Sequence, residues 1–172
     1  ETIEVEDAIK ALVTKSANDV AVVVAEAIGG DQDTFAQMMT RKARSLGMNS
    51  TTFRNASGLP NPEQVTTARD LTILGRAIHD HFPKYWRYFQ TRNFQYAGRN
   101  YRNHNKLLGR VDGVDGIKTG YTRASGFNLL TSARDGNRHV MAVVLGGRSG
   151  RIRDQQMASL VENHIESASG GG

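Results

Sequence analysis

The stretch between residues 127 and 145 places the strongest constraint on the fold. Two runs rich in apolar residues, Phe127–Ala133 and Arg138–Leu145, flank the dipeptide Asp135-Gly136. Asp-Gly between two such runs is the sequence signal of a tight β-hairpin turn. We therefore predict two long antiparallel strands, the second of which should end at Gly146-Gly147.

Helical spacing dominates the chain before this hairpin. Apolar residues recur every three or four positions in Glu6–Thr14, and a strongly apolar run, Asp19–Ile28, stops at Gly29-Gly30. We predict a helix for each run, and we expect the second helix to be buried because it is apolar almost throughout. Three further helices are predicted from similar spacing, around Phe35–Leu46, Thr67–Ile78 and Ile152–Val161.

Two shorter signals refine this outline. Thr67 followed by Asp70 resembles a capping box, in which the side chains at both positions bond to the first turn of a helix. A second hairpin is predicted from Phe94–Tyr96 and Tyr101–Asn103, separated by Ala97–Asn100.

The order of these elements indicates the fold class. Helices come first, and strands followed by one terminal helix come later, so we expect an α+β domain with an antiparallel sheet packed by helices. A chain of 172 residues is long enough for one domain with a substantial core. We assign that domain to residues 1–166 and interpret Ser167–Gly172 as a glycine-rich tail or linker.

The charge balance gives weaker information. The net charge is +5, and the basic residues look scattered, with Arg148, Arg151 and Arg153 the densest cluster, which we interpret as a solvated face. A basic nucleic-acid-binding module is one reading, although the aromatic residues do not alternate with Lys or Arg along a strand. The absence of cysteine excludes disulfides and thiolate catalysis.

Two tripeptides carry the chemical signal. Ser16-Ala17-Asn18 lies in a break between two predicted helices, and Lys118-Thr119-Gly120 follows 102 residues after it. S-x-N alone is common by chance, but its pairing with K-T-G in this order is part of the signature of penicillin-recognising enzymes. The five histidines show no metal-binding spacing with carboxylates, so we expect neither a metal nor another cofactor.

Longer blocks support a family. The chain resembles the serine-type D-alanyl-D-alanine carboxypeptidases among the low-molecular-weight penicillin-binding proteins. VEDAIKALVTKSANDVAVVVAEAIGG resembles the family's helix–SxN–helix unit, ARSLGMNSTTFRNASGLP its next helix and loop, and VDGIKTGYTRASGFNLLTSA a later block. The resemblance implies a β-lactamase/transpeptidase-like fold and action on peptidoglycan outside the cytoplasm. It also implies D-Ala-D-Ala stem peptides as substrate and β-lactam antibiotics as ligands.

One departure from the family is as informative as the match. The family's nucleophile is the serine of S-x-x-K, upstream of the SxN unit, and no S-x-x-K occurs in these 172 residues. We therefore expect a later portion of the catalytic domain, incomplete and inactive without an upstream segment supplied in cis or as a second fragment. A non-catalytic β-lactam or peptidoglycan sensor of the same fold is the alternative, and endopeptidases and β-lactamases share the motifs.

The resemblance also implies catalytic roles at the first motif. Ser16 would relay a proton between the missing lysine and the leaving D-alanine nitrogen, and Asn18 would bond that lysine and the substrate amide. Either side chain could instead cap the helix predicted at Asp19–Ile28, so a structural role stays open for both.

The second motif would bind substrate. Lys118 would place positive charge near the relay and the substrate carboxylate, to which Thr119 would offer a hydroxyl. Gly120 would let a substrate strand approach the sheet edge, and the Tyr121 N–H would form half of the oxyanion hole. The alternative is that KTGYT is a basic turn with no binding role.

Overall fold

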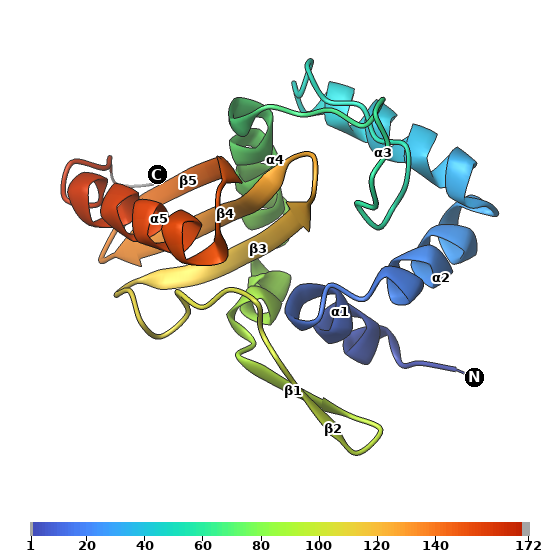
Figure 1. The fold of residues 1–172 in the computed structure, drawn as a ribbon, viewed down its shortest axis with the longest axis horizontal. Coiled ribbons are helices and arrows are strands. Elements are labelled where there is room, and N and C mark those ends of the chain that lie inside the picture. Colours follow the sequence, from blue (N-terminus) through green and yellow to red (C-terminus); the bar gives the residue numbers. More distant parts are fainter. Residues whose placement is uncertain (1, 170–172) are drawn as a thin grey trace.

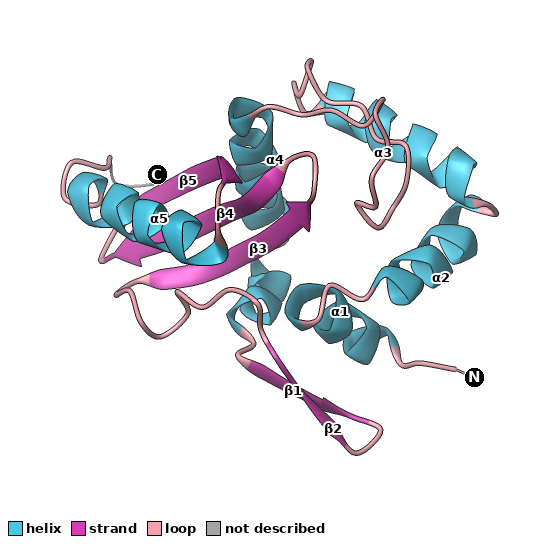
Figure 2. Cartoon of the chain, in the orientation of Figure 1, coloured by secondary structure: helices cyan, strands magenta, loops and turns pink. Residues whose placement is uncertain are grey.

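The structure is a computed structural model that describes residues 2–169, so the last three residues of the predicted tail lie outside the described residues. Helices and an antiparallel sheet confirm the predicted α+β class (Figures 1 and 2). In chain order the elements are α1 (Val5–Thr14), α2 (Asn18–Gly29), α3 (Gln32–Ser45), α4 (Ala68–His81), the 3-10 helix η1 (Pro83–Gln90), β1 (Asn93–Tyr96), β2 (Arg99–Arg102), β3 (Val114–Thr122), β4 (Gly126–Asp135), β5 (Arg138–Gly147) and α5 (Gly150–His164).

The main sheet has the strand order β3-β4-β5, with all neighbours antiparallel. The hairpin predicted between residues 127 and 145 is confirmed as β4 and β5, which close at the pair Asp135–Arg138. The KTGYT sequence lies inside β3, where Lys118 pairs with Leu130 and Gly120 with Asn128. It is therefore part of a strand at the edge of this sheet, and the interpretation as a basic turn is wrong.

Each face of the sheet has its own helical cover (Figure 1). Leu129 faces the core beneath α5, together with Met157 and Val161 of that helix. The next residue, Leu130, faces the opposite core, which contains Trp86 of η1. Alternation along β4 thus buries both faces, as expected for a central strand covered on both sides.

Helix α2 forms where it is predicted, but its predicted burial is wrong. Val23 and Ile28 are 54% and 61% exposed, and only Ala21 and Ala25 are buried. The reason is its position: α2 contacts α1 and α3 beside the sheet instead of lying under it (Figure 1). Although α2 is strongly apolar, neither it nor any other helix within residues 2–169 is long and apolar enough to cross a membrane.

The capping box predicted at the start of α4 is only half formed. The Thr67 hydroxyl accepts a hydrogen bond from the Asp70 N–H at 3.1 Å, as predicted. The buried Asp70 carboxylate does not return to the cap but accepts from the Ser50 N–H (2.9 Å) and the Thr51 hydroxyl (2.6 Å). Both donors belong to the loop before α4, so these hydrogen bonds tie that loop to the helix. They also compensate for the burial of the carboxylate, which would be costly without donors.

The second hairpin is confirmed with shifted ends. Strands β1 and β2 pair from Asn93–Arg102 to Tyr96–Arg99, so the loop contains only Ala97 and Gly98. Both loop residues have positive φ, 47° and 74°, as a two-residue hairpin turn requires. The second strand begins two residues before its predicted start, because Arg99 and Asn100 lack the apolar character by which strands are recognised.

Candidate active site

Ser16 lies in the turn between α1 and α2. Its φ of 58° places a non-glycine residue in the left-handed region. Thr14, two residues before Ser16, is fully buried, and its hydroxyl donates a hydrogen bond to the Lys10 carbonyl at 2.7 Å. The Thr14 carbonyl in turn accepts the His104 N–H at 3.3 Å. These bonds hold the end of α1 in place.

The two motifs meet at a hydrogen bond. The Lys118 Nζ donates to the Ser16 Oγ at 2.9 Å, across 102 residues of sequence. The same ammonium donates to the Thr119 carbonyl at 2.6 Å. With Asn18 and Gly120, these three residues line one cavity of about 550 Å³. The structure therefore brings five of the six predicted site residues to one space.

The cavity combines this polar group with extensive apolar walls. The turn-rich loop Asn55–Pro62 contributes Ala56 and Ser57, which the motifs did not identify. The shape of this loop is set by Asn55. Its side chain accepts a hydrogen bond from the Gly58 N–H at 2.7 Å and donates one to the Leu59 carbonyl at 2.9 Å. The apolar lining comes mainly from α1, α4 and the sheet: Ile9, Leu12, Val13, Leu71, Leu74, Ile78, Ile117, Leu129, Leu130 and Leu145.

Asn18 and Ser16 do not cap α2. Asn18 is the first residue of the helix, and Ala17, which has no capping side chain, occupies the N-cap position. The capping interpretation of both residues is therefore wrong. Their side chains line the cavity instead.

Gly120 and Tyr121 are placed differently from each other. A Cβ added at Gly120 would meet no atom within 4 Å, so the space beside this strand position is open. Tyr121 is 59% exposed, with its ring centre 4.4 Å from that of Phe127. Tyr121 does not line the main cavity but a second, polar hollow shared with Arg148. Any role of Tyr121 at the cavity would thus belong to its backbone.

Burial makes Lys118 an unusual lysine. It lowers the pKa of the ammonium to about 8, and the nearby positive charge of Arg153 acts in the same direction. Arg153 is only 6% exposed, so the prediction that it belongs to a solvated face is wrong. Its guanidinium donates to the adjacent Asp154 carboxylate at 2.7 and 3.0 Å, which compensates for its burial. Lys118 lines the cavity, where an incoming anion would meet its ammonium, whereas Arg153 is buried and paired with Asp154.

We expect Lys118 to titrate near pH 8, because its environment disfavours the ammonium. Carbon NMR of the chain with labelled lysine side chains should show one resonance moving near this pH, and that resonance should disappear in Lys118→Arg. Because the folded state binds fewer protons than the unfolded one between pH 8 and 10.5, unfolding should become less favourable as the pH rises through that window. Titration of every lysine near 10.5 would contradict the expectation.

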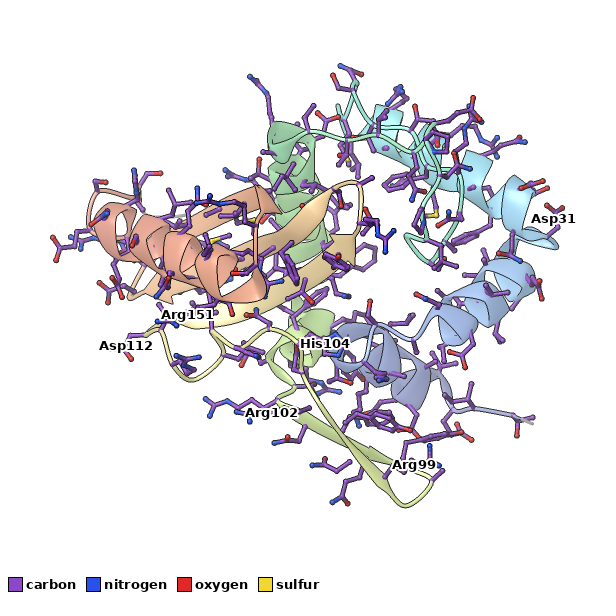
Figure 3. All side chains as sticks on the ribbon, viewed as in Figure 1. Asp31, Arg99, Arg102, His104, Asp112 and Arg151 are labelled. Atoms are coloured by element: carbon purple, nitrogen blue, oxygen red, sulfur yellow. The ribbon has the colours of Figure 1, made fainter. Side chains whose placement is uncertain are left out.

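Two asparagines, Asn103 and Asn105, hold the loop after β2 against strand β3. Asn105 is 3% exposed and its side chain donates to the Gly116 carbonyl in β3 at 3.1 Å, while its N–H donates to the Asn103 side chain at 2.8 Å. His104 lies between them, near the end of α1 (Figure 3), and burial together with the charge of Lys118 lowers its pKa. The alternating Asn-His-Asn is the local signal of this support in the sequence.

Comparison with known proteins shows which family this chain resembles. The family model described as D-alanyl-D-alanine carboxypeptidase matches residues 1–149. D-alanyl-D-alanine carboxypeptidase DacD of Escherichia coli is 36% identical over 160 residues, which are 92% of this chain and 41% of the relative. The chain thus spans about two fifths of the length of this relative.

Solved structures agree with the sequence match. Penicillin-binding protein 6B of Escherichia coli aligns with a TM-score of 0.87 and 36% identity over 93% of this chain and 51% of its own. Penicillin-binding protein D2 of Listeria monocytogenes, in its cefotaxime-bound form, aligns with a TM-score of 0.87 and 31% identity over 94% and 66%. Given the family match over most of its length and the shared fold, the chain belongs to the D-alanyl-D-alanine carboxypeptidase family.

Proposed function

We propose that this chain is part of a serine D-alanyl-D-alanine carboxypeptidase, which removes the terminal D-alanine from peptidoglycan stem peptides outside the cytoplasm. The observation that carries the proposal is the bond between Lys118 Nζ and Ser16 Oγ at 2.9 Å. A lysine held against a serine in the wall of an apolar cavity can combine proton transfer with binding of an anionic chain end.

The residues divide the work between proton transfer and binding. Ser16 relays a proton toward the leaving nitrogen, and Asn18 bonds the substrate amide. Lys118 and Thr119 hold the terminal carboxylate of the substrate, whose backbone runs along the open edge beside Gly120. The Tyr121 N–H stabilises the oxyanion, for which such donors are worth about 10²–10³ in rate.

The attacking serine comes from outside these residues. None of the serines in this chain is followed by lysine three positions later. We propose that an S-x-x-K segment, in cis or on a second fragment, lies against the apolar cavity wall and presents its serine beside Ser16. β-lactams would acylate the same serine, since the Listeria protein of this fold is described in a cefotaxime-bound form.

Replacement of Lys118 by alanine tests the binding role. In the full gene product, or in this chain combined with the S-x-x-K segment, Lys118→Ala should slow both penicillin acylation and D-alanine release. The loss of a charge-assisted hydrogen bond is worth about 1.5–3 kcal/mol, or roughly ten- to a hundredfold or slightly more in second-order rate. Stopped-flow acylation and a D-alanine assay would measure the two rates.

A charge-matched control separates a local effect from a general one. Arg151→Ala removes one positive charge from exposed Arg151 at the start of α5 (Figure 3) and should leave both rates unchanged. If Lys118→Ala acylates as fast as the parent, the proposed role of this residue fails.

A further inference from the structure

The positive charge of this chain is concentrated in one segment. Residues 81–111 contain seven Lys and Arg residues and no Asp or Glu, whereas the other 141 residues contain 15 Lys and Arg against 17 Asp and Glu. The whole excess of positive charge therefore comes from η1, the β1–β2 hairpin and the loop that follows. The interpretation of the basic residues as scattered is wrong, because it considered local clusters and not the absence of acids over a long stretch.

These seven cations are available to a partner. All of them are exposed, and none forms an ion pair with a carboxylate among residues 2–169. By contrast, several cations elsewhere are neutralised locally, such as Arg138 by Asp135 at 3.8 Å. A group of unpaired, like-charged side chains produces a field that attracts a multiply charged anion.

The hairpin sorts its side chains onto two faces. The pairs Phe94–Tyr101 and Tyr96–Arg99 share the face toward α1, with Phe94 only 5% exposed. The opposite face consists of cross-strand neighbours that are all exposed and polar. Figure 3 shows Arg99 and Arg102 on the two sides of the hairpin. The polar neighbours are Asn93 with Arg102, and Gln95 with Asn100.

Two further guanidinium groups belong to residues just beyond the open end of the hairpin, outside its two strands. Arg92 precedes β1, and its guanidinium lies against Gly109, where an added Cβ would collide with it. Arg110 is the next residue along the chain, and it is exposed as well. We call this set the hairpin outer face: Arg92, Asn93, Gln95, Asn100, Arg102 and Arg110.

The hairpin outer face is connected to the candidate active site. The Asn103 N–H, which directly follows β2, donates to the Arg92 carbonyl at 2.8 Å. The next N–H, that of His104, donates to the Thr14 carbonyl, two residues before Ser16. A long polymer held on the hairpin would therefore lie close to the cavity that receives its side branch.

We propose that the hairpin outer face binds the carboxylate-bearing glycan–peptide polymer of the cell wall and holds it while one stem peptide enters the cavity. This inference rests on the proposed function for the identity of the polymer. Guanidinium groups match carboxylates through paired hydrogen bonds, and the neighbouring carboxamides can bond sugar hydroxyl and peptide amide groups.

Two other classes of anionic partner fit less well. A membrane-binding surface combines cations with apolar side chains that enter the lipid, and the hairpin outer face has no apolar side chain. Single-stranded nucleic acid is held by exposed aromatic rings, whereas Tyr96 and Tyr101 are half-buried on the opposite face.

Cosedimentation with insoluble peptidoglycan tests the proposal. The full gene product should bind, and the triple variant Arg92→Gln/Arg102→Gln/Arg110→Gln should bind about tenfold more weakly, since each exposed ionic contact contributes a modest amount. The control variant Arg41→Gln/Arg69→Gln/Arg151→Gln removes the same charge from exposed arginines elsewhere and should bind within about twofold of the parent. Blocking the polymer's carboxylates by amidation should abolish the difference between the two variants.

Release of D-alanine from a short soluble peptide should be unchanged in both triple variants, because neither touches the cavity. Equal weakening by both variants would overturn the proposal, as would tight binding to amidated polymer that still depends on the hairpin arginines. Hairpin-dependent binding to anionic vesicles or single-stranded DNA, with no effect on peptidoglycan, would overturn it as well. If the parent binds peptidoglycan through the hairpin but releases no D-alanine, the proposed function fails and the binding surface stands.

Discussion

Mixed with a labelled penicillin at neutral pH, the 172-residue chain should remain at its unmodified mass. Acylation needs an activated serine, and no serine here belongs to an S-x-x-K sequence. Within residues 2–169, Ser16 is the one serine bonded to a lysine ammonium, but with a pKa of about 8 Lys118 is mostly protonated at pH 7 and cannot accept the serine proton. Intact-mass spectrometry after a long incubation would make the measurement.

The same experiment has a positive arm. Addition of the S-x-x-K segment, in cis or as a second fragment, should produce one acyl group per molecule on the serine of that segment. An adduct on this chain alone would show that a residue within it can act as nucleophile. Repeating the incubation at pH 9, where Lys118 is largely neutral, would reveal whether Ser16 is that residue.

Removal of the Ser16 hydroxyl should have the larger effect on turnover. In the enzyme that contains the S-x-x-K segment, Ser16→Ala is expected to lower kcat by about 10²–10⁴, the usual contribution of a positioned proton-transfer group. Substrate binding should change less, because the relay acts mainly in the transition state. Steady-state kinetics with a D-Ala-D-Ala peptide would separate kcat from KM.

The backbone at Ser16 calls for a second variant. At φ 58° any residue with a Cβ is strained by about 1 kcal/mol, so alanine keeps the strain that Ser16 already has, whereas glycine adopts this conformation freely. Ser16→Gly should therefore keep the turn and still lose the same activity as Ser16→Ala. Ser57→Ala, which removes another hydroxyl from the same cavity, should have little effect. Comparable losses from Ser57→Ala and Ser16→Ala would rule out a specific relay.

The sequence was sufficient where the signals are local. The Asp135-Gly136 hairpin and the helices have periodic or turn residues of their own, and both were predictable. The meeting of Ser16 with Lys118 followed from two motifs in a known order and not from any local rule.

Features that depend on packing were not predictable. The pKa of Lys118 depends on burial and on Arg153, which lies 35 positions later. The hydrogen bonds of Asp70 likewise depend on residues distant in sequence, because its partners belong to a loop that no local pattern links to α4. In each case the deciding neighbour is distant in sequence, and the residue type alone favours the ordinary solvated state.

Strand β3 has a consequence for how this protein behaves at high concentration. Within residues 2–169 it pairs with β4 alone, so its other side presents unpaired backbone groups, a template on which a second copy can add its own strand. Gly120 puts no side chain in the way, and exposed Tyr121 adds apolar surface. The same open edge is therefore prone to edge-to-edge aggregation at high protein concentration.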